Sequence, residues 1–143
     1  MTVSNNQAAW AAGVYLYEMS LSDSTITGNE AREDAGGVYS VGTNLMENVT
    51  ITDNTAAGTG GGVYLAGGDL LLTTCEVSGN TATAGGGAHV VSGTSLESDS
   101  SDWGDSTDGD DNSPDDVYVD DVATAYASYG SGESFVCDST GCF

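Results

Sequence analysis

The chain of 143 residues has 22 acidic side chains against one basic side chain, Arg32, and its formal net charge at pH 7 is −21. This balance excludes nucleic-acid binding and attraction to anionic membranes, because both need clusters of Lys and Arg. No apolar run reaches the roughly 18 residues of a membrane span, and the first residues lack the basic and apolar parts of a signal peptide. We therefore expect one small domain without direct membrane insertion.

Two sequence blocks recur in step along the chain. In the first block an Asn follows a Val or Ile by three residues and precedes an Ala by two, and the second block reads Gly-Gly-Val-Tyr or a close variant. Both return every 23 to 26 residues, which is typical of a repeat architecture. In chain order, copies of the first block begin at Val3, Ile26, Ile51 and Val77, and copies of the second cover residues 12–15, 36–39, 61–64 and 86–89.

Within each copy, apolar and polar residues alternate, which indicates strands. Helices are disfavoured because Gly pairs, Thr and Val dominate the sequence. A sheet of hairpins would turn about every 8 to 12 residues and would not return the same Asn only once per period. We therefore predict coils of three short strands and three turns, stacked ~4.8 Å apart. The predicted inward columns are Leu21, Met46 and Leu72; Ser24, Val49 and Cys75; Ile26, Ile51 and Val77; and Ala31, Ala56 and Ala82.

The repeated Gly-Gly-Val-Tyr and Ile-Thr-Gly-Asn-x-Ala segments resemble the right-handed parallel β-helix repeats of bacterial surface and secreted proteins. Those repeats have the pectin-lyase-like fold, which also underlies polymorphic outer-membrane proteins and autotransporter passengers. The resemblance implies an all-β chain that folds as a right-handed parallel β-helix. Residues 1–93 would form about four coils, and residues 94–143 an acidic, irregular terminal coil and a tail within the same domain.

Four asparagines, one in each predicted coil, are expected at a tight corner, where Asn tolerates a left-handed backbone. We predict that their amides bond from coil to coil as an internal ladder. A row of amides that binds a ligand is the alternative. The four residues are Asn6, Asn29, Asn54 and Asn80.

The residue after the inward position of the second block faces outward by alternation. These residues form a stripe of rings, which is suited to binding carbohydrate, to covering the sheet or to contacting a neighbouring subunit. We interpret His89, a lone imidazole in the Tyr position of its coil, as a substituted stripe residue rather than a catalyst. The predicted ligand-binding stripe is Tyr15, Tyr39, Tyr64 and His89.

The three cysteines divide into two kinds. Cys75 lies in a predicted inward column and is interpreted as a small buried residue. Cys137 and Cys142 enclose a short loop with a Gly, and we predict a disulfide between them, which fits an oxidising extracellular compartment. Zinc would need two further soft ligands, and none is close in sequence.

An acidic segment, residues 97–121, follows the repeats and holds 11 acidic side chains. Clustered carboxylates are the hard oxygen ligands that Ca²⁺ takes, although their spacing does not match an EF-hand. Calcium is therefore a candidate cofactor, and a solvated, charged end coil is the alternative. The candidate ligands are Asp105, Asp108, Asp110, Asp111 and Asp115.

The same fold serves polysaccharide lyases and glycoside hydrolases, so catalysis has to be weighed. The polygalacturonase-type Gly-His-Gly and Arg-Ile-Lys motifs are absent from the sequence, and Arg32 lies among acidic residues. A surface of this charge would also repel polyuronate substrates. We expect a protein that is not an enzyme, with a remnant of a polysaccharide lyase or hydrolase as the third interpretation.

By analogy of fold, we expect an extracellular or cell-surface structural or adhesive solenoid of a bacterium or archaeon. The second interpretation is a carbohydrate-binding module that uses the Tyr stripe. The chain begins in mid-coil at Val3, so its first strands would present unpaired backbone groups. We expect an upstream segment, or a second copy in a head-to-tail filament, to cover this edge.

Overall fold

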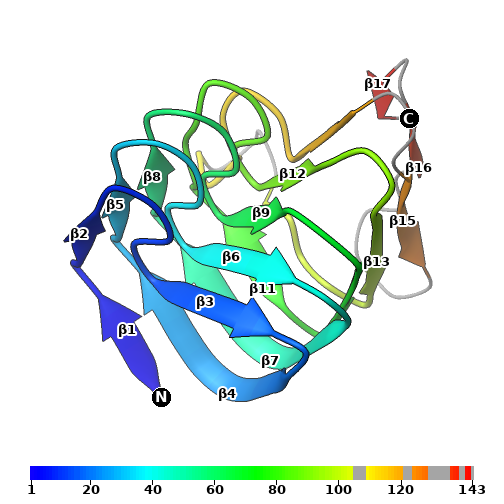
Figure 1. Ribbon diagram of the computed structural model, residues 1–143, viewed down its shortest axis with the longest axis horizontal. Helices are drawn as coiled ribbons and strands as arrows, with labels where there is room; N and C mark the ends of the chain where they lie inside the picture. The colour runs from blue at the N-terminus through cyan, green and yellow to red at the C-terminus, as the bar shows by residue number, and fades with distance from the viewer. Residues whose placement is uncertain (105–108, 121–123, 129–135, 139–140, 143) are drawn as a thin grey trace.

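The chain winds into a solenoid of about five coils, whose strands stack into parallel sheets (Figure 1). The computed structural model describes residues 1–104, 109–120, 124–128, 136–138 and 141–142, and in the strands after residue 120 it describes the backbone. No helix in this part of the chain is long and apolar enough to cross a membrane. The predicted all-β fold of stacked parallel coils is confirmed.

Sheet A has nine strands in the described part of the chain and extends along the solenoid. Most of its strands are parallel to their neighbours, as expected when each coil repeats the path of the coil before. Its parallel strands are β1 (Thr2–Ser4), β4 (Ser20–Thr27), β7 (Asn44–Thr52), β10 (Asp69–Thr73), β11 (Glu76–Ser78), β13 (Ser95–Asp99) and β15 (Thr124–Ser128), followed by antiparallel β16 (Val136–Asp138) and β17 (Gly141–Cys142).

Two smaller parallel sheets complete the coils. Sheet B consists of very short strands near the Asn corner, and sheet C carries the aromatic residues of the second sequence block. Sheet B contains β2 (Gln7–Ala8), β5 (Glu30–Ala31) and β8 (Thr55–Ala56). Sheet C contains β3 (Val14–Tyr17), β6 (Val38–Val41), β9 (Val63–Leu65), β12 (Ala88–Val90) and β14 (Val117–Val119).

The register of the sheets places equivalent residues of successive coils directly over one another. Ile51 is the partner of Ile26 on one side and of Val77 on the other. All three are completely buried. The other predicted inward columns also face the core, with Leu21 and Ala82 at its partly buried margin. Stacking of like apolar residues therefore forms one large core and a separate small cluster of alanines, and burial of apolar surface in them is the main stabilising contribution.

The glycine pairs lie where neighbouring coils approach most closely. A Cβ atom added at Gly62 would lie 2.6 Å from the carbonyl oxygen of Gly87, and one added at Gly37 would lie 2.5 Å from the carbonyl oxygen of Gly62. Both distances are too short for any side chain. The corner before sheet C therefore requires residues without a side chain in consecutive coils.

Regular stacking continues past residue 93, where the sequence predicted an irregular end. β13 pairs in parallel with β10, Ser113 pairs with Thr81 as an isolated bridge, and β14 pairs in parallel with β12. This fifth coil also buries Trp103, whose indole nitrogen donates to the Ser98 hydroxyl oxygen at 3.0 Å. The predicted terminal coil is therefore present, and its strands stack in register with those of the coil before it.

Candidate functional site

One ring from each strand of sheet C forms a continuous row on the outer face of the solenoid. We call this row the aromatic stripe. The register of the five strands places each member beside the next. The exposed fraction falls from 56% at Tyr15 to 8% at His89 and rises again to 43% at Tyr118. The aromatic stripe consists of Tyr15, Tyr39, Tyr64, His89 and Tyr118.

The rings of the aromatic stripe stack on one another. The ring centroid of Tyr39 lies 5.3 Å from that of Tyr15 and 5.3 Å from that of Tyr64, and the interplanar angles are 9° and 26°. The ring of His89 meets Tyr64 and Tyr118 edge to face, with both centroids 5.2 Å away. A sugar that packs flat against a ring needs a free ring face. In the inner tyrosines the neighbouring rings cover those faces, so the stripe is better suited to holding coils together than to forming a flat sugar-binding platform.

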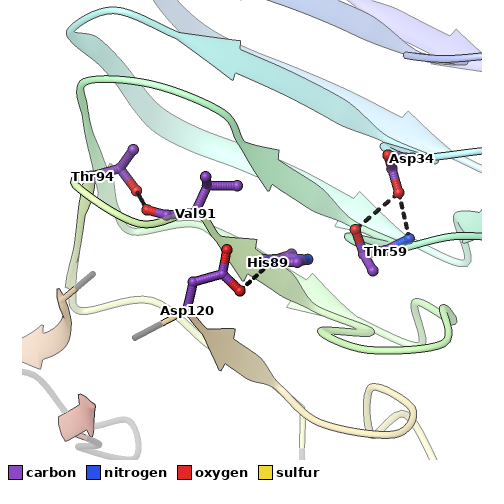
Figure 2. A network of polar contacts seen from close by, with 6 residues as sticks. All are labelled: Asp34, Thr59, His89, Val91, Thr94 and Asp120. Atoms are coloured by element: carbon purple, nitrogen blue, oxygen red, sulfur yellow. Dashed lines mark hydrogen bonds and ion pairs between the residues drawn. The ribbon is translucent and has the colours of Figure 1, made fainter. Parts of the chain in front are cut away.

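His89 is joined to the fifth coil by an acidic partner. Its Nε2 atom lies 3.2 Å from Oδ1 of Asp120, which follows β14 (Figure 2). Its Nδ1 atom is buried and has no hydrogen-bond partner among the described residues. No hydroxyl or thiol of the described residues bonds to the imidazole, so the pair lacks the nucleophile of a Ser-His-Asp arrangement.

Figure 2 also draws two other polar contacts. Oδ1 of Asp34 accepts hydrogen bonds from the Thr59 backbone N–H at 2.8 Å and from the Thr59 hydroxyl at 2.9 Å. The Thr94 hydroxyl donates to the carbonyl oxygen of Val91 at 2.6 Å. Both contacts join turn residues, and they fix the loops on either side of sheet C.

The electrostatic environment of the aromatic stripe is negative. Burial raises the pKa of the Tyr64 phenol above its ordinary value, and the charge of Asp34, then Tyr39, then the charge of Asp120 raise it further. A neighbouring negative charge disfavours the phenolate, as does loss of contact with water. Tyr64 is therefore held in its neutral form and is unsuited to act as a base.

The predicted asparagines lie in one row at the corner between sheets A and B. Oδ1 of Asn54 accepts from the backbone N–H of Asn29 at 3.0 Å and from its Nδ2 at 2.9 Å. Asn54 in turn donates from Nδ2 to Oδ1 of Asn80 at 3.0 Å. Asn29, Asn54 and Asn80 are completely buried. Because these donors and acceptors are directed to the next coil, the row acts as an internal ladder.

Two members of these rows lie in the fifth coil and were not predicted. Oδ1 of Asn112 accepts from the backbone N–H of Asn80 at 3.1 Å, and Tyr118 is the partner of His89 in the register of sheet C. The Val-Tyr pair at 117–118 matches the second sequence block and was a usable signal. The separation of 32 residues between Asn80 and Asn112 concealed it, because the earlier ladder steps span 23 to 26.

The calcium prediction concerns a region that the structure describes only in part. Asp105 and Asp108 lie outside the described residues, whereas Asp110, Asp111 and Asp115 lie within them. Within the described ranges, no group of three or more His, Cys, Asp or Glu side chains is placed to hold a metal ion. Calcium binding therefore stays a prediction.

The cysteines differ in their surroundings, as their sequence positions indicate. Cys75 is buried in the core, and burial raises the pKa of its thiol. Cys137 and Cys142 are partners in the antiparallel register of β16 and β17, and Cα atoms at such positions are about 4.5 to 5.5 Å apart. That range suits a disulfide. The structure describes only the backbone of these two residues, so the disulfide itself stays a prediction.

A family model described as a right-handed β-helix region matches residues 1–102 of the chain. No curated protein and no solved structure matches the chain significantly. The narrower relationship to pectin lyases and autotransporter passengers stays a prediction. The match covers most of the chain and agrees with the stacked parallel coils of the structure, so the chain belongs to the right-handed β-helix family.

Proposed function

We propose that this chain is a rigid structural or adhesive element of an extracellular or cell-surface protein. The observation that carries the proposal is how the repeated side chains are used. The asparagines bond to asparagines of the next coil, and the rings of the aromatic stripe pack against each other. Repeated residues that serve coil stacking favour a mechanical role over catalysis.

Support for an extracellular location comes from the end of the chain and from its charge. The pairing of β16 with β17 sets Cys137 opposite Cys142, and a disulfide there would form in an oxidising compartment. A net charge of −21 keeps a protein soluble and repels other acidic surfaces. Both features suit a spacer that works in solution outside the cell.

The location is tested with antibodies raised against the folded chain. We expect them to label intact source cells, or the medium around them, as strongly as they label permeabilised cells. A brief treatment of intact cells with a non-specific protease should remove the cell-bound signal. Labelling that requires permeabilisation would refute the extracellular proposal.

The mechanical role is tested separately, by offering the purified chain a panel of neutral and acidic polysaccharides. We expect no release of reducing or unsaturated sugar. Release of sugar that is lost in the His89→Phe variant and kept in Tyr15→Phe would replace the structural proposal with a catalytic one. Sugar binding without release, lost in Tyr39→Ala, would favour the carbohydrate-binding interpretation instead.

A further inference from the structure

The first coil differs from the rest of the chain in charge and in exposed apolar surface. Residues 1–17 contain no acidic or basic side chain, in a sequence with 22 acidic residues. Six large hydrophobic side chains are exposed among the described residues, and five of them lie in the first 19 positions. They are Met1, Trp10, Tyr15, Tyr17 and Met19.

The edge strand of this coil is apolar and has free backbone groups along one side. β3 is the last strand of sheet C and reads Val-Tyr-Leu-Tyr (Figure 1). The backbone N–H groups of Val14 and Glu18 donate toward β6. Because alternate residues of a strand direct their backbone groups to opposite sides, those of Tyr15 and Tyr17 point to the open edge. Edges of this kind are usually blunted by Pro or by charge.

The opposite edge of the same sheet carries that protection. β14 is the other edge strand of sheet C, and Asp115, Asp116 and Asp120 flank it. In sheet A, the edge of β15 is occupied by antiparallel β16. A head-to-tail contact would bring the first coil against this acidic end and would remove carboxylates from water. In a contact between residues 1–17 of two copies, these segments would bury no carboxylate, because they contain none.

We propose that β3 pairs antiparallel with β3 of a second copy, in a two-fold dimer that brings together the two segments 1–17, which have no charged side chains. The two-fold axis passes between the two Leu16 residues. Tyr15 of each copy then lies opposite Tyr17 of the other, and each pair exchanges two backbone hydrogen bonds. Sheet C becomes continuous through both copies. Such an interface is closed, so association stops at two copies. The proposal is independent of where the protein is located.

The pairing uses the features that leave the edge exposed in one copy. Tyr15 and Tyr17 are 56% and 57% exposed, and aromatic side chains directly across an antiparallel pair stabilise it. Leu16 faces the core of its own copy, and Tyr15 and Tyr17 face outward. In the proposed register, apolar side chains of both copies therefore stay on the core side of the sheet and the tyrosines stay on the outer side. Repulsion between two chains of charge −21 opposes the dimer, and salt screens that repulsion.

The test is sedimentation velocity on the full chain over a wide concentration range at high salt. We expect a reversible, compact species of two copies. Tyr17→Lys should weaken dimerisation about tenfold, because two cross-strand aromatic pairs are lost. Tyr118→Lys adds the same charge at the far edge of sheet C and should dimerise like the parent. Circular dichroism checks that each variant is folded.

Hydrogen exchange gives a second measurement that needs no variant. Exchange of the Tyr15 and Tyr17 amides should slow as the concentration rises, while that of Tyr118 should not. A monomer at every concentration, or open-ended growth into filaments, would overturn the proposal. So would a dimer that Tyr17→Lys and Tyr118→Lys weaken equally and in which the Tyr15 and Tyr17 amides exchange at a rate independent of concentration.

Discussion

Nε2 of His89 on β12 lies 3.2 Å from Oδ1 of Asp120, which follows β14, and this contact joins the fourth coil to the fifth. The imidazole lies between two aromatic rings, and its other nitrogen is buried without a partner among the described residues. An unsatisfied buried polar atom destabilises a fold. The contact with Asp120 is therefore the only described hydrogen bond that offsets the burial of this ring.

Replacing Asp120 with Ala should reveal how much this contact contributes. The change leaves both ring nitrogens without a partner, and we expect the free energy of unfolding to fall by about 1 to 2 kcal/mol. Chemical denaturation measures the difference. Asp115→Ala is the matched control, because Asp115 is exposed and its loss relieves the same amount of negative charge. Equal stability of the two variants would show that the contact contributes nothing.

The asparagine ladder should be far more sensitive at its centre than at its end. Asn54→Ala removes the acceptor for Asn29 and the donor to the carbonyl oxygen of Ile26 and to Oδ1 of Asn80. Each group left buried and unpaired costs about 1 to 3 kcal/mol, so the total loss should reach about 3 kcal/mol or more.

Asn6→Ala provides the comparison within the same ladder. Asn6 is exposed, and the one hydrogen bond described for its side chain runs from Nδ2 to Oδ1 of Asn29. Water can replace this bond, so we expect a loss below about 1 kcal/mol. The two variants are compared by guanidinium unfolding at the same salt concentration. A loss as small for Asn54→Ala as for Asn6→Ala would show that the ladder is not a source of stability.

Two glycines on the same coil should respond oppositely to Ala. In Gly62→Ala the new methyl group would lie 2.6 Å from a backbone oxygen of Gly87, which the rigid stack cannot move away. We expect a loss of about 2 kcal/mol or more. At Gly67 the nearest atom is Cγ1 of Val41 at 3.6 Å, so Gly67→Ala should be neutral or stabilise by up to ~1 kcal/mol. Thermal melting of both variants against the parent checks this contrast, and similar melting temperatures would contradict it.

The columns of the core could be predicted because two signals of different length agree. Alternation sets which side chains face inward, and the period of about 25 residues sets which of them meet, as with Ile26, Ile51 and Val77. The register of the fifth coil could not be predicted because 32 residues separate Asn80 from Asn112. Without that register, nothing in the sequence placed Asp120 beside His89. Contacts that depend on an irregular connection are not encoded in the repeat.

Tyr64 should contribute to the loss of stability at alkaline pH, alongside the buried Cys75 thiol, whose pKa is also raised by burial. Its pKa is raised in the folded chain by burial first, and then by Asp34, Tyr39 and Asp120. A raised folded pKa means that the neutral phenol stabilises the fold below its ordinary pKa of about 10, and that this contribution is lost as the pH rises further. The chain has no Lys and one Arg, so few other cationic groups lose charge in this range.

Denaturant unfolding at about pH 8 and about pH 11 should therefore show a smaller loss of unfolding free energy in Tyr64→Phe than in the parent. Tyr15→Phe, at the open end of the aromatic stripe, leaves Tyr64 in place, so its unfolding free energy should fall between the two pH values by as much as that of the parent. If Tyr64→Phe lost as much stability as the parent between the two pH values, burial of this phenol would not contribute to the loss of stability at alkaline pH.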